Sequence, residues 1–180
     1  MSSALVQNYA RIDVAFERGE GAYLFADNGR RFLDFASGIG VTSLGHAHPA
    51  VTKALKDQAD RLWHVSNLYH IQPQARLAER LVANSFSERA FFCNSGAEAV
   101  EAAIKMARQY HRLTGNATKY KIIGRYHSWH GSTMGSLSAG GLKSRRAVNE
   151  PLAPGFLHVF PPTCYRCPFG KKYGECNIEC

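Results

Sequence analysis

Apolar and polar positions in the first half of the chain predict a hairpin, a loop and two helices. Residues 21–35 alternate large apolar side chains around Asn28-Gly29, which is a strong hairpin signal because both turn positions need positive φ. Residues 36–50 are rich in Gly and predict a loop. Apolar residues then recur at helical spacing from Pro49 and again from Pro73, which predicts two helices.

The pattern in the second half is typical of alternating strands and helices. Residues 88–93 predict a short buried strand, and residues 120–126 and 156–160 predict two more. An amphipathic helix lies between the first two, with its predicted buried stripe at i, i+3, i+4 and i+7: Val100, Ala103, Ile104 and Ala107. Glu101 and Lys105 are predicted to pair on its exposed side.

This order of elements predicts an α/β fold. A strand, a helix and a second strand in sequence form a βαβ unit, in which the strands run parallel. The hairpin, loop and first helix predict a smaller N-terminal α+β lobe over residues 1–70. Residues 71–180 then form a larger domain with a mostly parallel sheet, and residues 164–180 are its Cys-rich tail.

Charge and hydropathy exclude two classes of partner. The formal net charge is +8, but the 22 Lys and Arg residues are spread along the chain, and the densest run, residues 143–146, lacks interleaved aromatic residues. A solvated loop or a site for small anions fits this run better than a nucleic-acid surface. No apolar stretch approaches the roughly 20 residues of a membrane span. The N-terminus lacks the features of a signal peptide, so we expect a cytoplasmic protein.

The junction Asn94-Ser95-Gly96-Ala97 joins a predicted strand to a predicted helix and allows two interpretations. Asn94 or Ser95 can act as a simple N-cap. Alternatively, the small residues leave the free N–H groups of the helix N-terminus open to an anion such as a phosphate, at the carboxyl edge of a parallel sheet. These four residues alone do not decide between the two.

A second motif is predicted at the same edge of the sheet. Trp129-His130-Gly131 lies in the segment that follows the next predicted strand. An aromatic face beside an anion site suits a flat phosphorylated heterocycle, with stacking at one end and helix N–H groups at the other. The alternative is that Trp129 is a core residue and His130 a turn histidine.

Four of the five cysteines gather near the C-terminus with the spacing C-x2-C-x8-C-x3-C: Cys164, Cys167, Cys176 and Cys180. This spacing is compatible with Zn²⁺ or an iron–sulfur cluster, although free thiols in a surface insertion are the preferred interpretation. Disulfides are a third alternative, which a cytosolic chain disfavours. His46 and His48 are predicted to be turn and surface residues.

Four segments together resemble the class III aminotransferases of the acetylornithine, 4-aminobutyrate and ω-amino-acid type. They are "YLFADNGRRFLDFASGIGVTSLGHAHPAV", "SNLYHIQPQARLAERL", "FFCNSGAEAVEAAIKMAR" and "KIIGRYHSWHGSTMG", in the family's order and at its spacings. The resemblance implies a fold-type I transferase that uses pyridoxal 5′-phosphate (PLP) and forms a homodimer. It implies transfer of an amino group to a 2-oxo acid. Some family members carry a similar Cys-rich insertion, and some distant ones hold iron–sulfur clusters.

The resemblance also implies cofactor contacts for individual residues. Ser95, Gly96 and Ala97 match the positions that hold the cofactor phosphate. Trp129 matches the aromatic residue that stacks on the pyridine ring, and His130 with the following glycine completes that motif.

Substrate contacts follow from the same resemblance. Ile39, Gly40 and Val41 fall in a loop that lines the substrate pocket, and Tyr69 matches a segment that reaches toward the partner subunit's site. One position departs from the family pattern. Where acetylornithine and ornithine members have an Arg that clamps the substrate α-carboxylate, this chain has Ser132, which cannot form a bidentate ion pair. We therefore expect an ω-amino acid or amine donor, such as a 4-aminobutyrate-like substrate, in preference to acetylornithine.

In the family, the Schiff-base Lys and the carboxylate that contacts the pyridinium nitrogen both follow the matched region. None of the eight lysines of this chain has the family's context. We therefore expect an N-terminal portion of a longer enzyme, inactive alone, with both groups beyond Cys180. Two alternatives stay open: a PLP-dependent aminomutase of the same family, and a non-catalytic Cys-rich metal-binding module.

Overall fold

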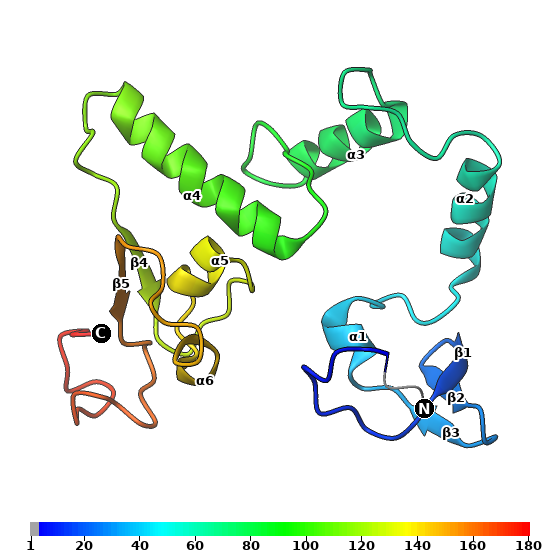
Figure 1. Ribbon diagram of the computed structural model, residues 1–180, viewed down its shortest axis with the longest axis horizontal. Coiled ribbons are helices and arrows are strands. Elements are labelled where there is room, and N and C mark those ends of the chain that lie inside the picture. Colours follow the sequence, from blue (N-terminus) through cyan, green and yellow to red (C-terminus); the bar gives the residue numbers. More distant parts are fainter. Residues whose placement is uncertain (1–3) are drawn as a thin grey trace. The chain divides into compact units, whose positions relative to one another are not determined.

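A computed structural model describes residues 4–180, so residues 1–3 of the predicted N-terminal lobe lie outside the described chain (Figure 1). The chain divides into two compact units, the first ending at Ala75 and the second running from Arg76 to Cys180. This division is close to the predicted boundary between residues 70 and 71, and the assignment of the units to family lobes stays a prediction. Among the described residues, none of the helices has the length and hydropathy needed to cross a lipid bilayer.

The first unit contains a three-stranded antiparallel sheet of β1 (Phe16–Glu20), β2 (Tyr23–Ala26) and β3 (Arg31–Leu33), in that order. The predicted hairpin between β2 and β3 is confirmed. Its turn is wider than a two-residue loop, and within it only Gly29 has positive φ, at 81°. The apolar pattern missed β1 because Phe16 is the only large apolar residue in that strand.

Helices α1 (Ser37–Gly40) and α2 (Pro49–Ala59) follow the sheet, and α3 (Gln72–Ala83) comes next along the chain. α2 and α3 confirm the two predicted helices, and α2 has the predicted Pro in its first turn. α1 is a short turn within the Gly-rich loop. It includes Ile39 at a φ of 67°, which is a strained conformation for a β-branched residue.

A partly buried hydrogen bond folds the Gly-rich loop back toward the sheet. His46 Nε2 lies 2.7 Å from Asp34 Oδ2, and the Asp34 side chain is only 7% exposed. Asp34 also accepts hydrogen bonds from the backbone N–H groups of Ala36 and Ser37. The bond to His46, followed by the one to Ser37, lowers the pKa of Asp34. His46 is therefore the partner of a buried carboxylate, and the prediction of a surface residue is wrong.

The second unit contains a parallel pair of strands, β4 (Ile122–Arg125) and β5 (Phe156–Val159), as predicted. The long helix α4 (Gly96–Leu113) precedes β4, and the short helices α5 (Met134–Ala139) and α6 (Lys143–Arg146) lie in the crossover from β4 to β5 (Figure 1). The parallel strands agree with the predicted α/β organisation.

Two expectations about the second unit are wrong. Residues 88–93 form no strand: no neighbouring strand pairs with them in the part of the chain that the structure describes, and Phe91 is 67% exposed. On α4, Ile104 is buried and Val100 half-buried, whereas the two alanines of the predicted stripe are exposed. The reason is that α4 packs mainly against the short helix α5, which covers only part of the stripe.

Helix α5 is the best-buried element of the second unit. Its residues from Ser136 to Ala139 are all buried. A Cβ on Gly124 would collide with the carbonyl oxygen of Ala139, so the glycine lets β4 approach α5 closely. Ser138 Oγ donates to the carbonyl of Met134 and accepts from the N–H of Ala153. These contacts fix α5, and with it the loop that joins β4 to α5.

We expect Asp34→Asn to lower the melting temperature of the protein at neutral pH, because the neutral amide loses the charge-assisted bond to His46. Folding lowers the pKa of Asp34, so its carboxylate adds stability above the ordinary Asp pKa of about 3.9. That contribution is lost as pH falls through the lowered pKa. Thermal unfolding from pH 7 to pH 3 should therefore show the difference between wild type and variant shrinking below about pH 4.

Asp27→Asn is the matched control, because it removes an exposed carboxylate of the hairpin turn. This variant should stay within about 0.5 kcal/mol of wild type. An Asp34→Asn protein that melts with wild type at neutral pH would show that the pair does not stabilise the loop.

Candidate functional site

The N-terminus of α4 is capped and still presents free donors. Ser95 is the N-cap, and its Oγ accepts a hydrogen bond of 3.2 Å from the N–H of Glu98. The Glu98 carboxylate accepts bonds from the backbone and side-chain amides of Asn94, and these bonds lower the pKa of Glu98. Among residues 4–180, no protein acceptor is found for the N–H groups of Gly96 and Ala97. The junction is therefore a cap and an open pair of donors at once.

The loop that carries Trp129 lies against this helix end. One hollow is lined by Gly96, Ala97 and Val100 of α4 and by residues 129–133 of the loop. The approach is close at Gly131, where a Cβ would lie 2.8 Å from the Cβ of Ala97. The structure therefore brings together the two motifs that the sequence predicted to share one edge of the sheet.

The chemistry of the hollow suits a small anion joined to a flat ring. Apart from its chain neighbours and the backbone of its own helix, no described atom lies within 4 Å of the position of a Cβ on Gly96, so an anion can reach the backbone there. Trp129 is 55% exposed in the wall of the hollow, and His130 is half-buried in the same wall. Trp129 is therefore not a core residue, and its ring is accessible to a ligand.

Glu101 joins the loop to α4. Its Oε1 accepts a hydrogen bond from the hydroxyl of Thr133 and a second, of 2.9 Å, from the N–H of Ser136. The bond from Thr133 is the main reason that the pKa of Glu101 is lowered, and the charge of Lys105 contributes less. The predicted exposed pair of Glu101 with Lys105 is therefore wrong, because the carboxylate faces the loop.

Sequence reasoning missed this contact. Thr133 and Ser136 form a capping box at the start of α5, and the Thr-x-x-Ser spacing is a local signal that could have located that helix start. Nothing local in the sequence links Glu101 to Thr133, because the two residues belong to different elements.

The predicted substrate residues divide between the two units. Ile39, Gly40, Val41 and Tyr69 belong to the first unit, where Ile39 is 95% exposed and Tyr69 is 68% exposed. Ser132 belongs to the second unit and lines the hollow beside Trp129. Each unit is described by itself, so the role of these residues in one substrate pocket stays a prediction.

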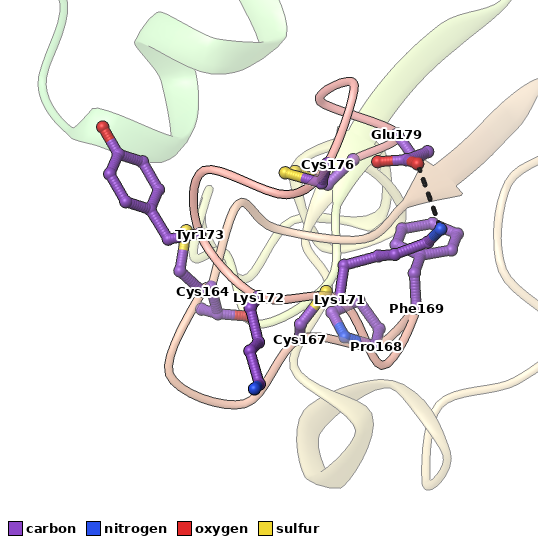
Figure 2. A pocket seen from close by; sticks show the side chains of 11 residues that line it. Cys164, Cys167, Pro168, Phe169, Lys171, Lys172, Tyr173, Cys176 and Glu179 are labelled. Atoms are coloured by element: carbon purple, nitrogen blue, oxygen red, sulfur yellow. Dashed lines mark ion pairs between the residues drawn. The ribbon is translucent and has the colours of Figure 1, made fainter.

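The four C-terminal cysteines line a separate, small hollow (Figure 2). Cys167 and Cys176 are half-buried, Cys164 and Cys180 are exposed, and all four are free thiols. An ion pair of 3.8 Å between Lys171 and Glu179 crosses this segment. Within residues 4–180, no three His, Cys, Asp or Glu side chains are placed to hold a metal ion. The structure therefore does not bring the thiols to one point, and the metal hypothesis stays a prediction.

Comparison with known proteins places the chain in a family. Residues 4–179 match the family Aminotransferase class-III. The acetylornithine aminotransferase of Aquifex aeolicus is 53% identical over 156 residues, which are 86% of this chain and 41% of that protein. The acetylornithine aminotransferase of Agrobacterium fabrum is 46% identical over 158 residues, 88% of this chain and 40% of that protein. The chain thus spans about 40% of the length of these curated relatives.

Solved structures of transaminases also match this chain. The omega transaminase from Pseudomonas jessenii in complex with PMP matches this chain with a TM-score of 0.81 at 32% identity, covering 87% of this chain and 36% of that one. The fold is therefore that of the fold-type I transferases, and PLP is the cofactor of the matched family. With a family match over residues 4–179 and relatives of this identity, the chain belongs to the class III aminotransferases.

Proposed function

We propose that this chain holds the phosphate and ring of PLP in an enzyme that moves an amino group from an ω-amino acid or amine to a 2-oxo acid. The observation that carries the proposal is the hollow where the free N–H groups of α4 meet the exposed ring of Trp129. These are the two features that a phosphorylated heterocycle needs.

The phosphate is proposed to bind at the start of α4. The N–H groups of Gly96 and Ala97 donate to its oxygens, and the positive end of the helix dipole favours its charge. Ser95 takes part as well, because its Oγ uses a lone pair to cap the helix and keeps its proton free to donate. Three donors from three consecutive residues then fix the anion.

The ring is proposed to lie against Trp129. The indole face packs on one side of the cofactor and excludes water from it, and His130 lies next to it in the same wall. When bound, PLP supplies the electron sink that makes amino-group transfer feasible. The residues of this chain bind and orient the cofactor.

The residues that act on the substrate amine are proposed to lie outside this chain. Among the residues that line the described hollow there is no lysine. We propose that the lysine that bonds to the cofactor and the carboxylate for its ring nitrogen follow the matched region, since the chain spans about 40% of the length of its curated relatives. A homodimer in the cytoplasm, with small-molecule substrates, stays part of the proposal.

Two donor classes compete. Ser132 lines the hollow at the position where α-carboxylate-binding members have Arg, which supports an ω-amino acid or amine such as 4-aminobutyrate. The names of the curated relatives support an acetylornithine-like donor. The family match gives no support to a non-catalytic Cys-rich module or to an aminomutase. A donor screen on the enzyme, with 4-aminobutyrate and acetylornithine side by side, tests the choice.

Ser95→Asp separates capping from phosphate binding. Asp is as good an N-cap as Ser, so the variant should melt with wild type, but its charge repels the phosphate. We expect the dissociation constant for PLP to rise at least about tenfold, since a lost charge-assisted hydrogen bond costs about 1.5–3 kcal/mol. Ser95→Thr keeps both roles and is the control. Titration of the apoprotein with PLP gives the answer, and wild-type affinity in Ser95→Asp would place the phosphate elsewhere.

Ser132→Arg tests the donor assignment. The new guanidinium can pair with an α-carboxylate, so kcat/KM for acetylornithine should rise at least about tenfold relative to 4-aminobutyrate. Ser132→Gln, of similar length without charge, is the control and should leave the ratio of the two donors near that of wild type. A wild-type enzyme that already prefers acetylornithine would overturn the proposed donor class.

The 180-residue chain by itself should form no specific covalent bond with PLP. After mixing with equimolar PLP and reduction with borohydride, mass spectrometry should find no single lysine carrying the cofactor. Stoichiometric labelling of one of its eight lysines would refute this expectation.

A further inference from the structure

We propose that Glu101 is a positioning residue that sets the distance between the Trp129 ring and the phosphate-binding end of α4. The inference rests on the PLP site proposed above. Glu101 itself does not line that hollow, so its role is to hold the residues that do.

The loop contacts one face of α4 at two points. Ala97 and Glu101 are four residues apart and therefore lie one above the other on the helix. Gly131 packs against Ala97, and a Cβ on it would lie 3.0 Å from the Cα of that residue. Thr133 and Ser136 bond to Glu101. The loop therefore follows the helix for one turn, from the phosphate-binding end inward.

The bond from Ser136 to Glu101 is partly buried. Ser136 is fully buried, at 0% exposure, and its Oγ accepts a hydrogen bond from the N–H of Thr133. A charged acceptor is worth more where water is excluded. The lowered pKa of Glu101 shows that the same hydrogen bonds favour its charged form. The loop therefore binds Glu101 as a charged carboxylate.

Gly135 leaves a space that the carboxylate fills. A Cβ at this position would lie 2.5 Å from Oε2 and 2.7 Å from Oε1 of Glu101. A methyl group there would displace the carboxylate without changing any residue that lines the hollow. Gly135→Ala is therefore a second, independent way to disturb the contact.

The other end of the loop is held by backbone bonds. The carbonyl of Ser128 accepts a hydrogen bond of 3.0 Å from the N–H of Gly141. Trp129 follows directly, so along the chain this residue lies between the fixed point at Ser128 and the contact with Glu101. If the second contact is lost, the loop stays attached to β4 but is no longer fixed to the helix that binds the phosphate.

The test uses the fluorescence of Trp129 in the enzyme. The chain has two tryptophans, so Trp63→Phe leaves Trp129 as the reporter within this chain. In that background, apoprotein carrying Glu101→Gln or Gly135→Ala is titrated with PLP, and quenching of Trp129 and the melting temperature are recorded. Glu79→Gln, an exposed carboxylate of α3, is the matched control. Tryptophans elsewhere in the enzyme, where present, are replaced in the same background.

We expect Glu101→Gln and Gly135→Ala each to raise the dissociation constant for PLP about tenfold, the scale of one charge-assisted hydrogen bond. They should also reduce quenching at saturation, because the ring no longer lies at its fixed distance. Glu79→Gln should match the background on both readouts. If Glu101→Gln does not fold, the PLP affinity and Trp129 quenching of Gly135→Ala decide whether the proposal holds.

Binding and quenching within about twofold of the background, even with a lower melting temperature, would reduce Glu101 to a structural role and overturn the proposal. If the Trp63→Phe background itself fails to bind PLP, the proposed function fails instead. The two failures are thus distinguishable.

Discussion

The bond between the Glu101 carboxylate and the loop after β4 is the contact on which the arrangement of the candidate site depends. The N–H groups that we propose to bind the phosphate belong to α4, whereas the aromatic ring belongs to the loop between β4 and α5. Neither element fixes the other through its own backbone hydrogen bonds. Glu101 and the close approach of Gly131 to Ala97 supply that link. The start of α4 and the loop that carries Trp129 therefore line the same hollow.

Features that depend on local physics could be predicted from the sequence. The hairpin around Gly29, the helices α2, α3 and α4, and the parallel strands all carry apolar periodicity or turn residues within their own segments. Features that depend on a partner elsewhere could not. β1 has little apolar pattern and exists because β2 pairs with it. Residues 88–93 have a strand's pattern, but no partner pairs with them in the described chain.

The candidate site likewise has features that the sequence predicted and contacts that it did not. Trp129 beside the helix end was predicted from two parallel strands, although the first of them, residues 88–93, does not form in the described chain. A cap at Ser95 was one of the interpretations that the sequence left open. Glu101 was misassigned to the surface, since helical spacing pairs it with Lys105 and says nothing of a loop far along the chain. The partnership of Asp34 with His46 was missed for the same reason. Polar contacts between residues far apart in the sequence, in the candidate site as in the first unit, are what only the structure provides.

A crystal structure of the protein with bound PLP tests the cofactor site most directly. The phosphate oxygens should lie about 3 Å from the N–H groups of Gly96 and Ala97, with the pyridine ring against the face of Trp129. Glu101 should keep its bonds to Thr133 and Ser136 in that complex. A phosphate bound away from the start of α4, or a ring without contact to Trp129, would contradict the site described above.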